Sequence, residues 1–244
     1  MTISLTLATA IRVLRQIRHD PRTLAMLLVV PSALIGLLAW IYQGGGLFDR
    51  IGAPLLALFP VIVMFLITSV STLRERQSGT MERLLTLPLA KADLIGGYAV
   101  AFGGLGIAAA LIATAFSVQV LGLDVAGPLW LLVVVSTVDS LLGTALGLFI
   151  SAFARSEFQA VQFLPAVIVP QFLLCGLLVP RDDLPGGLSQ VSDILPLSYA
   201  IDAMTTITTS AQATGSVLKD VLIVAGFVLG LVILGAATLR RRTP

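Results

Sequence analysis

A single carboxyl group inside an apolar stretch is the residue of this chain with the clearest capacity for chemistry. Asp139 stands in the run LWLLVVVSTVDSLLGTALGLF. Gly143, Gly147 and Ser151 follow at intervals of four residues, so all four lie along one face of a helix, and the glycines allow a second helix to approach closely. An ionisable group inside a membrane costs about 3 kcal/mol, which makes function the default hypothesis. A proton site and a hydrogen-bonded structural carboxyl are both open, and in either case we expect Asp139 to face protein or a cavity.

Two amide side chains lie beside prolines in another apolar run. Gln162 and Gln171 flank Pro165 and Pro170, and each proline removes a backbone hydrogen bond and kinks a helix. The amides either satisfy the freed backbone groups or line a path through the membrane. Close packing is the alternative for the whole group.

Several classes of chemistry lack the residues that they need. The sequence has no GxxxxGK[ST] motif, so this chain cannot hold ATP phosphates as a P-loop does. Its one histidine, His19, precedes the first apolar run, which disfavours an intramembrane serine protease. Its one cysteine, Cys175, excludes an internal disulfide. No acids or histidines have metal-ligand spacing, and the net charge of +2 indicates no nucleic-acid surface. We therefore expect neither catalysis nor a metal site in this chain.

The composition is that of an integral membrane protein. Of 244 residues, 57% are hydrophobic and 11% charged, and the mean hydropathy is +1.01. An apolar run of about 20 residues can cross a bilayer as a helix. The predicted fold is all-α, a single polytopic transmembrane domain over residues 1–244. Its six predicted spans are Leu24–Tyr42, Pro54–Leu73, Leu94–Leu121, Leu129–Phe153, Val161–Val179 and Val221–Leu239.

The first 23 residues predict an amphipathic helix that lies on the membrane surface. At 100° per residue, one arc of this helix collects apolar side chains, namely Ile3, Leu7, Ala10, Val13, Leu14 and Ile17. The opposite arc collects polar ones, namely Ser4, Arg12, Arg15, Gln16 and His19.

The distribution of basic residues predicts the orientation, because lysine and arginine are retained on the cytoplasmic side of short loops. With both termini in the cytoplasm, that side holds twelve of the fifteen basic residues, including Arg74, Arg76, Arg83 and Lys91. The far side holds Arg50, Arg181 and Lys219. This orientation places the polar residues 74–93 in the cytoplasm.

Residues 74–93, RERQSGTMERLLTLPLAKAD, predict a short helix at the membrane edge. Ser78 or Thr80 can cap it, and Glu82 then lies in its first turn, where a negative charge is favoured. Its apolar face consists of Met81, Leu84 and Leu85, and Pro88 ends it. Such a helix is a docking surface. An ordinary solvated loop is the alternative.

The same segment resembles a known family. The order Glu75, Gly79-Thr80, Glu82, Leu84-Leu85, Pro88 is similar to the coupling-helix segment of ATP-binding-cassette exporter permeases of the type 2 class, which includes drug and polysaccharide exporters. The resemblance implies that this segment sits in a groove on a separate ATPase subunit, which would bind ATP and Mg. Glu75, Glu82 and Arg83 would then make polar contacts there, and Met81, Leu84 and Leu85 would fill the groove. Where the family often has Gly-Lys, this chain has Gly97-Tyr98.

Residues 180–220 predict an external segment that is partly re-entrant. Pro180, Pro185 and Pro196 break it into short helical pieces, and Leu184, Leu188, Ile194 and Leu197 give those pieces apolar groups to bury. Gly176, Leu184-Pro185 and the run Leu195 to Tyr199 resemble the pattern of the same exporter family between its last two spans. Met204 and Thr205 stand where the family often has an arginine.

The resemblance implies the membrane subunit of an ATP-driven exporter. It would pair with a second copy of itself or a paralogous permease and with an ATPase subunit, in a bacterial plasma membrane. The few aromatic residues favour a hydrophobic or amphipathic cargo such as a drug or a lipid. Two other classes remain open: a proton-coupled secondary transporter that uses Asp139, and a membrane scaffold that transports nothing.

Overall fold

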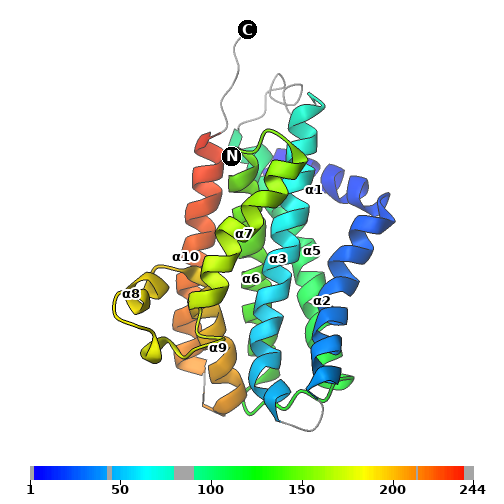
Figure 1. The fold of residues 1–244 in the computed structure, drawn as a ribbon. Helices are drawn as coiled ribbons and strands as arrows, with labels where there is room; N and C mark the ends of the chain where they lie inside the picture. The colour runs from blue at the N-terminus through cyan, green and yellow to red at the C-terminus, as the bar shows by residue number, and fades with distance from the viewer. Residues whose placement is uncertain (1–2, 43–45, 80–90, 213, 239–244) are drawn as a thin grey trace.

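Among the residues that the structure describes, six helices are long and apolar enough to cross a membrane. The computed structural model describes residues 3–42, 46–79, 91–212 and 214–238, and within these ranges the chain forms helices and no strands (Figure 1). The six helices are α2 (Pro21–Ile41), α3 (Leu47–Gln77), α5 (Lys91–Gln119), α6 (Leu129–Ser151), α7 (Glu157–Leu174) and α10 (Thr214–Thr238). The predicted all-α polytopic fold with six spans is therefore confirmed.

The predicted bounds of α7 are wrong by about one turn at each end, because the prediction followed apolarity alone. Ser156 caps the helix, and its hydroxyl accepts a hydrogen bond of 3.1 Å from the backbone N–H of Gln159. The helix therefore begins at Glu157 and not at Val161. It ends before Gly176, which has a φ of +92° that favours glycine.

Helices α3 and α6 form the core of the bundle. In their most apolar stretches, 67% of the α3 residues and 72% of the α6 residues are buried, against 17% in α2 and 11% in α10. Gly143 and Gly147 of α6 face α3. A Cβ atom on Gly143 would overlap the carbonyl oxygen of Val61, and one on Gly147 would lie 2.7 Å from that of Phe65. The predicted close approach at GxxxG is thus confirmed, with α3 as the neighbouring helix.

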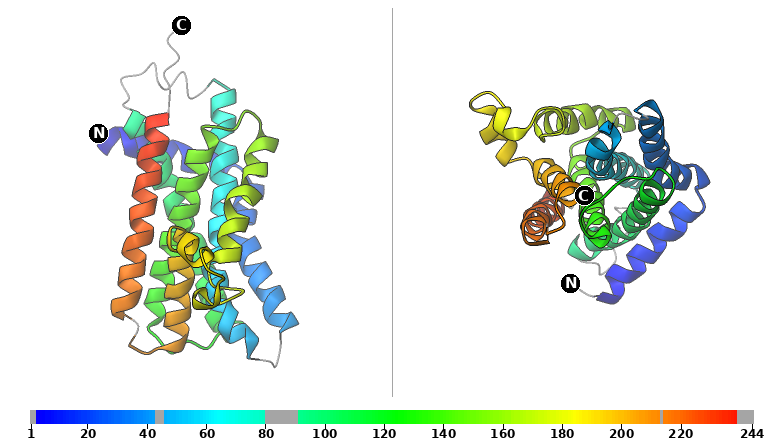
Figure 2. Two further views of the ribbon diagram at one scale, coloured as in Figure 1. Left: turned by 60° about the vertical axis from the view of Figure 1, so that its left-hand side comes forward. Right: turned by 90° about the horizontal axis from the view of Figure 1, so that it is seen from below.

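Helix α1 (Ile3–Arg18) lies across one end of the bundle (Figure 2). Ala10, Val13 and Ile17 are buried, as predicted for the apolar arc, whereas Ile3 and Leu7 of the same arc are exposed. Small polar residues complete the buried face: Thr6 and Thr9 are buried, and a Cβ atom on Gly97 of α5 would overlap the side chain of Thr9. One part of the apolar arc of α1 is therefore packed inside the bundle, and the other part is exposed on its surface.

The segment between α7 and α10 lies in the half of the bundle away from α1, with α8 beside the bundle (Figure 1). It contains η1 (Arg181–Asp183), α8 (Leu188–Asp193) and α9 (Pro196–Thr209). The predicted short helices are present, and Leu197 is buried. Leu188 and Ile194 are exposed, contrary to prediction, because the six-residue α8 has few neighbours to cover it. With 14 residues, α9 is shorter than the roughly 20 that a span needs, so it packs within the bundle without crossing it.

The glycine contact between α3 and α6 leads to a test of stability. We expect Gly143→Ala to destabilise the protein by about 1–3 kcal/mol, the usual cost of forcing extra atoms into a packed core. Thermal unfolding in detergent measures this as a lower midpoint. Gly226→Ala in α10 is the matched control, because nothing lies within 4 Å of its Cβ position. Equal midpoints for the two variants would contradict this packing.

Candidate functional site

The last turn of α3, which begins the polar segment of residues 74–93, is bonded to α1, α5, α6 and the start of α7. Glu75 and Gly79 are described, and they lie in this turn and immediately after it. Thr80, Met81, Glu82, Arg83, Leu84 and Leu85, the remaining predicted coupling residues, lie outside the described residues. The site is therefore built from the end of α3 and the side chains that hold it.

Glu75 is bound by α1 and α5. Nη1 and Nη2 of Arg12 each donate a hydrogen bond of 3.0 Å, one to each carboxylate oxygen. The hydroxyl of Tyr98 donates to Oε2 of Glu75 and lies 3.1 Å from Nη2 of Arg12. The guanidinium also lies 5.8 Å from the centroid of the Tyr98 ring. A bidentate pair with a third hydrogen-bonding group is the arrangement that a part-buried carboxylate requires.

Glu75 is held within the chain: both oxygens of its carboxylate are bonded, and its side chain is only 12% exposed. Its contact with an ATPase stays a prediction. Arg12 was expected on the outward polar arc of α1, but it points to Glu75. Burial lowers the pKa of Arg12, and its bonds to Glu75 and Tyr98 outweigh that effect and raise it. Tyr98 stands where the family often has lysine, so its hydroxyl has a role that the sequence comparison missed.

Other side chains of the same turn bond to the end of α6, the loop that follows it and the start of α7. Nε and Nη2 of Arg74 donate to the Glu157 carboxylate at 2.7 and 2.9 Å. Nη1 of Arg76 donates to the Ser151 carbonyl at the end of α6, at 2.8 Å, where a helix favours a cation. Gln77 donates to the Arg155 carbonyl at 2.9 Å. The end of α3 is thus joined to α1 and α5 on one side and to α6 and α7 on the other.

Asp93, the last residue of the polar segment, is also bonded to α1. Thr6 donates to the Asp93 carboxylate at 3.4 Å, and Asp93 is buried at the start of α5. Helix α1 therefore contacts both ends of the polar segment, through Arg12 at Glu75 and through Thr6 at Asp93.

The intramembrane candidates do not form one site. Asp139 is completely buried, so the expectation that it faces protein is confirmed, but it lies against α9 and α10 while the glycines face α3. Each step of four residues turns the helix face by about 40°, which separates Asp139 from Gly147. Gln162 is exposed, and Gln171 is buried with its amide nitrogen bonded to the Val167 carbonyl at 3.1 Å. Neither glutamine lines the hollow beside Asp139.

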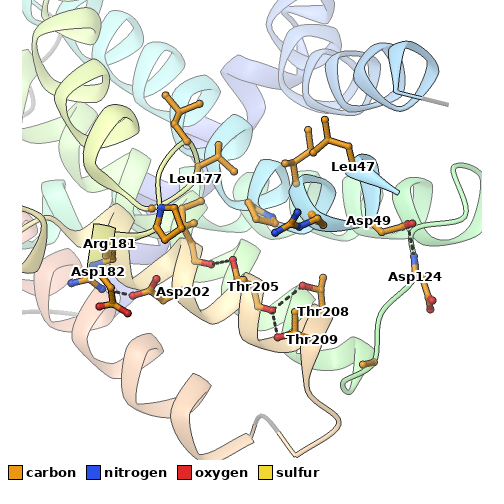
Figure 3. A pocket seen from close by; sticks show the side chains of 18 of the residues that line it. Leu47, Asp49, Asp124, Leu177, Arg181, Asp182, Asp202, Thr205, Thr208 and Thr209 are labelled. Atoms are coloured by element: carbon orange, nitrogen blue, oxygen red, sulfur yellow. Dashed lines mark hydrogen bonds and ion pairs between the residues drawn. The ribbon is translucent and has the colours of Figure 1, made fainter. Parts of the chain in front are cut away.

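A larger hollow of about 1210 Å³ opens at the end of the bundle away from α1 (Figure 3). It lies between the start of α3, the loop before α6 and helix α9. Its charged lining residues are mostly acidic, namely Asp49, Asp124, Asp182, Asp193 and Asp202, with Arg50 and Arg181. Such a lining favours cationic groups over anionic ones.

Arg181 holds one wall of this hollow. Its guanidinium pairs with the carboxylates of Asp193 and Asp202 and lies 5.3 Å from the centroid of the Tyr199 ring. Burial raises the pKa of the Asp202 carboxyl, and the bond to Arg181 offsets this only in part. Of the external motif, Tyr199 bonds the Asp193 carbonyl at 2.6 Å, Pro196 begins α9 and is buried, and Pro185 is exposed. Within the described ranges no group of three acids, histidines or cysteines could hold a metal ion.

Comparison with known proteins adds a family match. Residues 4–208 match the family described as ABC-2 type transporter. The chain is 30% identical over 144 residues to the probable multidrug ABC transporter permease YbhS of Escherichia coli (strain K12), which covers 59% of this chain and 38% of YbhS. It is 26% identical over 157 residues to the linearmycin resistance permease protein LnrN of Bacillus subtilis (strain 168), covering 64% of this chain and 40% of LnrN. The matched part thus spans about two fifths of each relative.

If the ion pair of Arg12 with Glu75 anchors α1 to the bundle, loss of the pair should loosen this helix. Glu75→Gln removes the charge that pairs with Arg12, and a hydrogen bond to a charged group is worth about 1.5–3 kcal/mol. We expect hydrogen–deuterium exchange in α1 to become at least about tenfold faster. Arg15→Gln, an exposed position of the same helix, is the control and should leave exchange unchanged. If Glu75→Gln and Arg15→Gln exchange alike, the pair does not anchor α1.

Proposed function

Because the chain belongs to the ABC-2 type transporter family, we propose that it is the transmembrane subunit of an ATP-driven exporter. The family is one of permease subunits, which are not themselves ATPases. The sequence supplies no P-loop of its own. ATP and Mg are therefore assigned to a separate ATPase subunit.

The observation that carries this proposal is the length of α3, which extends from the polar segment to the hollow at the other end of the bundle. Its 31 residues extend about 46 Å at 1.5 Å per residue. One end is the bonded turn that begins the polar segment, and the other end, Leu47 to Pro54, lines the outer hollow. A push on the polar segment is thereby carried from one end of the bundle to the other by one helix.

The coupling mechanism follows from these contacts. The residues Met81–Thr86 dock in a groove on the ATPase, and ATP-driven closure of the ATPase displaces them. Glu75 transfers the displacement to α1 and α5, and Arg74 and Arg76 transfer it to α6 and α7. ATP binding thus shifts the balance between two arrangements of the bundle by contacts that differ between them.

Export of a hydrophobic or amphipathic compound is the direction and cargo that we propose. YbhS is named as a probable multidrug permease and LnrN as a linearmycin resistance permease. The acidic outer hollow suits a cationic amphiphile as it leaves. Two copies of the chain, or one copy and a paralogue, enclose the path in a bacterial inner membrane with both termini in the cytoplasm.

A secondary transporter is the second candidate, because Asp139 is a completely buried carboxyl within a span. The two candidates differ in their energy source. Export that stops on ATP depletion supports the ATP-driven exporter. Export that survives ATP depletion and stops when the proton gradient is dissipated supports the secondary transporter.

The docking of the polar segment predicts an uncoupled phenotype. We expect Glu82→Ala and Leu84→Ala to reduce dye export from proteoliposomes with the co-purified ATPase by at least about tenfold, since a central interface residue contributes 2 kcal/mol or more. Membrane insertion should be unchanged. Leu222→Ala is the matched control, because Leu222 is 71% exposed on α10. Normal export by Leu84→Ala would exclude this docking.

A further inference from the structure

Asp139 has a buried carboxyl group without a hydrogen-bond partner. The residue is 0% exposed, and neither Oδ1 nor Oδ2 is bonded. It lines a narrow hollow between α6, α9 and α10 that leaves no space for a water molecule. The other residues that line this hollow are mostly small or apolar: Val135, Val138, Tyr199, Ala200, Ala203, Asp220, Val221 and Val224.

These surroundings fit the acid and not its anion. An ionised carboxylate removed from water needs a cation or several hydrogen-bond donors, and the lining provides no cation. We propose that the Asp139 carboxyl is a proton-binding site, occupied while α9 and α10 pack on α6 and emptied when they separate from it.

The titratable groups described on the helices that pack on α6 supply no positive charge to this hollow. Tyr199 of α9 and Asp220 of α10 line the hollow, and both are neutral or negative, so neither neutralises an anion at Asp139. Asp202 of α9 is paired with Arg181. Other charged or phenolic side chains described on these helices do not line the hollow: Asp49, Arg50, Arg74, Glu75, Arg76, Asp93, Tyr98, Glu157 and Lys219.

Because the Asp139 carboxyl has no hydrogen-bond partner while the helices are packed, we infer that it acts in a second arrangement, in which α9 and α10 have separated from α6. A carboxyl that held these helices together would be hydrogen-bonded, as Ser192 and Ser198 are to each other at 3.0 Å. Separation of α9 and α10 from α6 hydrates the carboxyl of Asp139, which then releases its proton.

The sign of the pH dependence follows from linkage. The packed arrangement binds the proton more tightly than the separated one, so a rise in pH favours separation. The ratio of separated to packed protein increases by up to about tenfold per pH unit, the limit for one proton. Asp139→Asn, which is neutral at every pH, removes this dependence.

Infrared spectroscopy tests the proton directly. A protonated, unbonded carboxyl has a carbonyl stretching band above the amide band, and we expect this band at neutral pH and its loss in Asp139→Asn. Asp139→Glu keeps the acid and should shift the band, which covers the case in which Asp139→Asn does not fold. A spectrum that Asp139→Asn and Asp139→Glu both leave unchanged overturns the proposal.

Spin-label distances test the movement. Labels at Trp130→Cys on α6 and Leu222→Cys on α10, both exposed positions, are placed in a Cys175→Ser background. The fraction at the longer distance should rise with pH, and the same labels with Asp139→Asn should not respond. An equal response, or none in either protein, overturns the link between the proton and packing. Neither measurement needs the ATPase, so failure here is distinct from failure of the proposed function.

Discussion

A part-buried carboxylate must be paired, and that requirement organises the end of the bundle where the polar segment begins. Glu75 stands at the last turn of α3, where its side chain is only 12% exposed. Arg12 and Tyr98 both bond it, which requires α1 to lie across the bundle end and α5 to lie beneath it. Gly97 permits the close approach of α1 that this geometry needs. The paired charge of Glu75 and the buried residues Ala10, Val13 and Ile17 together hold α1 in this position.

The same turn divides the bundle into two sets of contacts. Glu75 connects α3 to α1 and α5, whereas Arg74 and Arg76 connect it to α6 and α7. Between these ends the α3–α6 contact is tight, since the carbonyls of Val61 and Phe65 fill the space beside the glycines. Tightly packed helices move together. On another face of α6, helices α9 and α10 meet it over the unbonded Asp139.

The features that the sequence predicted are those with a local cause. Six spans, the amphipathic α1 and the glycine contact follow from apolar runs, helical periodicity and the small size of glycine. The ion pairs of Arg12 with Glu75 and of Arg74 with Glu157 join residues 63 and 83 positions apart, and no local pattern marks such pairs. The direction of Asp139 was also missed, because spacing by four was treated as a straight line along a face that actually turns. The cap at Ser156 does have a local signal, a Ser-Glu pair before an apolar run, and a prediction from apolarity alone does not use it.

The central claim is that the bonded end of α3 faces the cytoplasm, where an ATPase can reach it, and that the acidic hollow faces outward. Single cysteines at Ser78 and Gln190, both exposed positions, are introduced into a Cys175→Ser background. They are then treated with a membrane-impermeant thiol reagent on intact and on permeabilised cells. The account predicts that Gln190→Cys reacts on intact cells and that Ser78→Cys reacts only after permeabilisation. Labelling of Ser78→Cys on intact cells would contradict it.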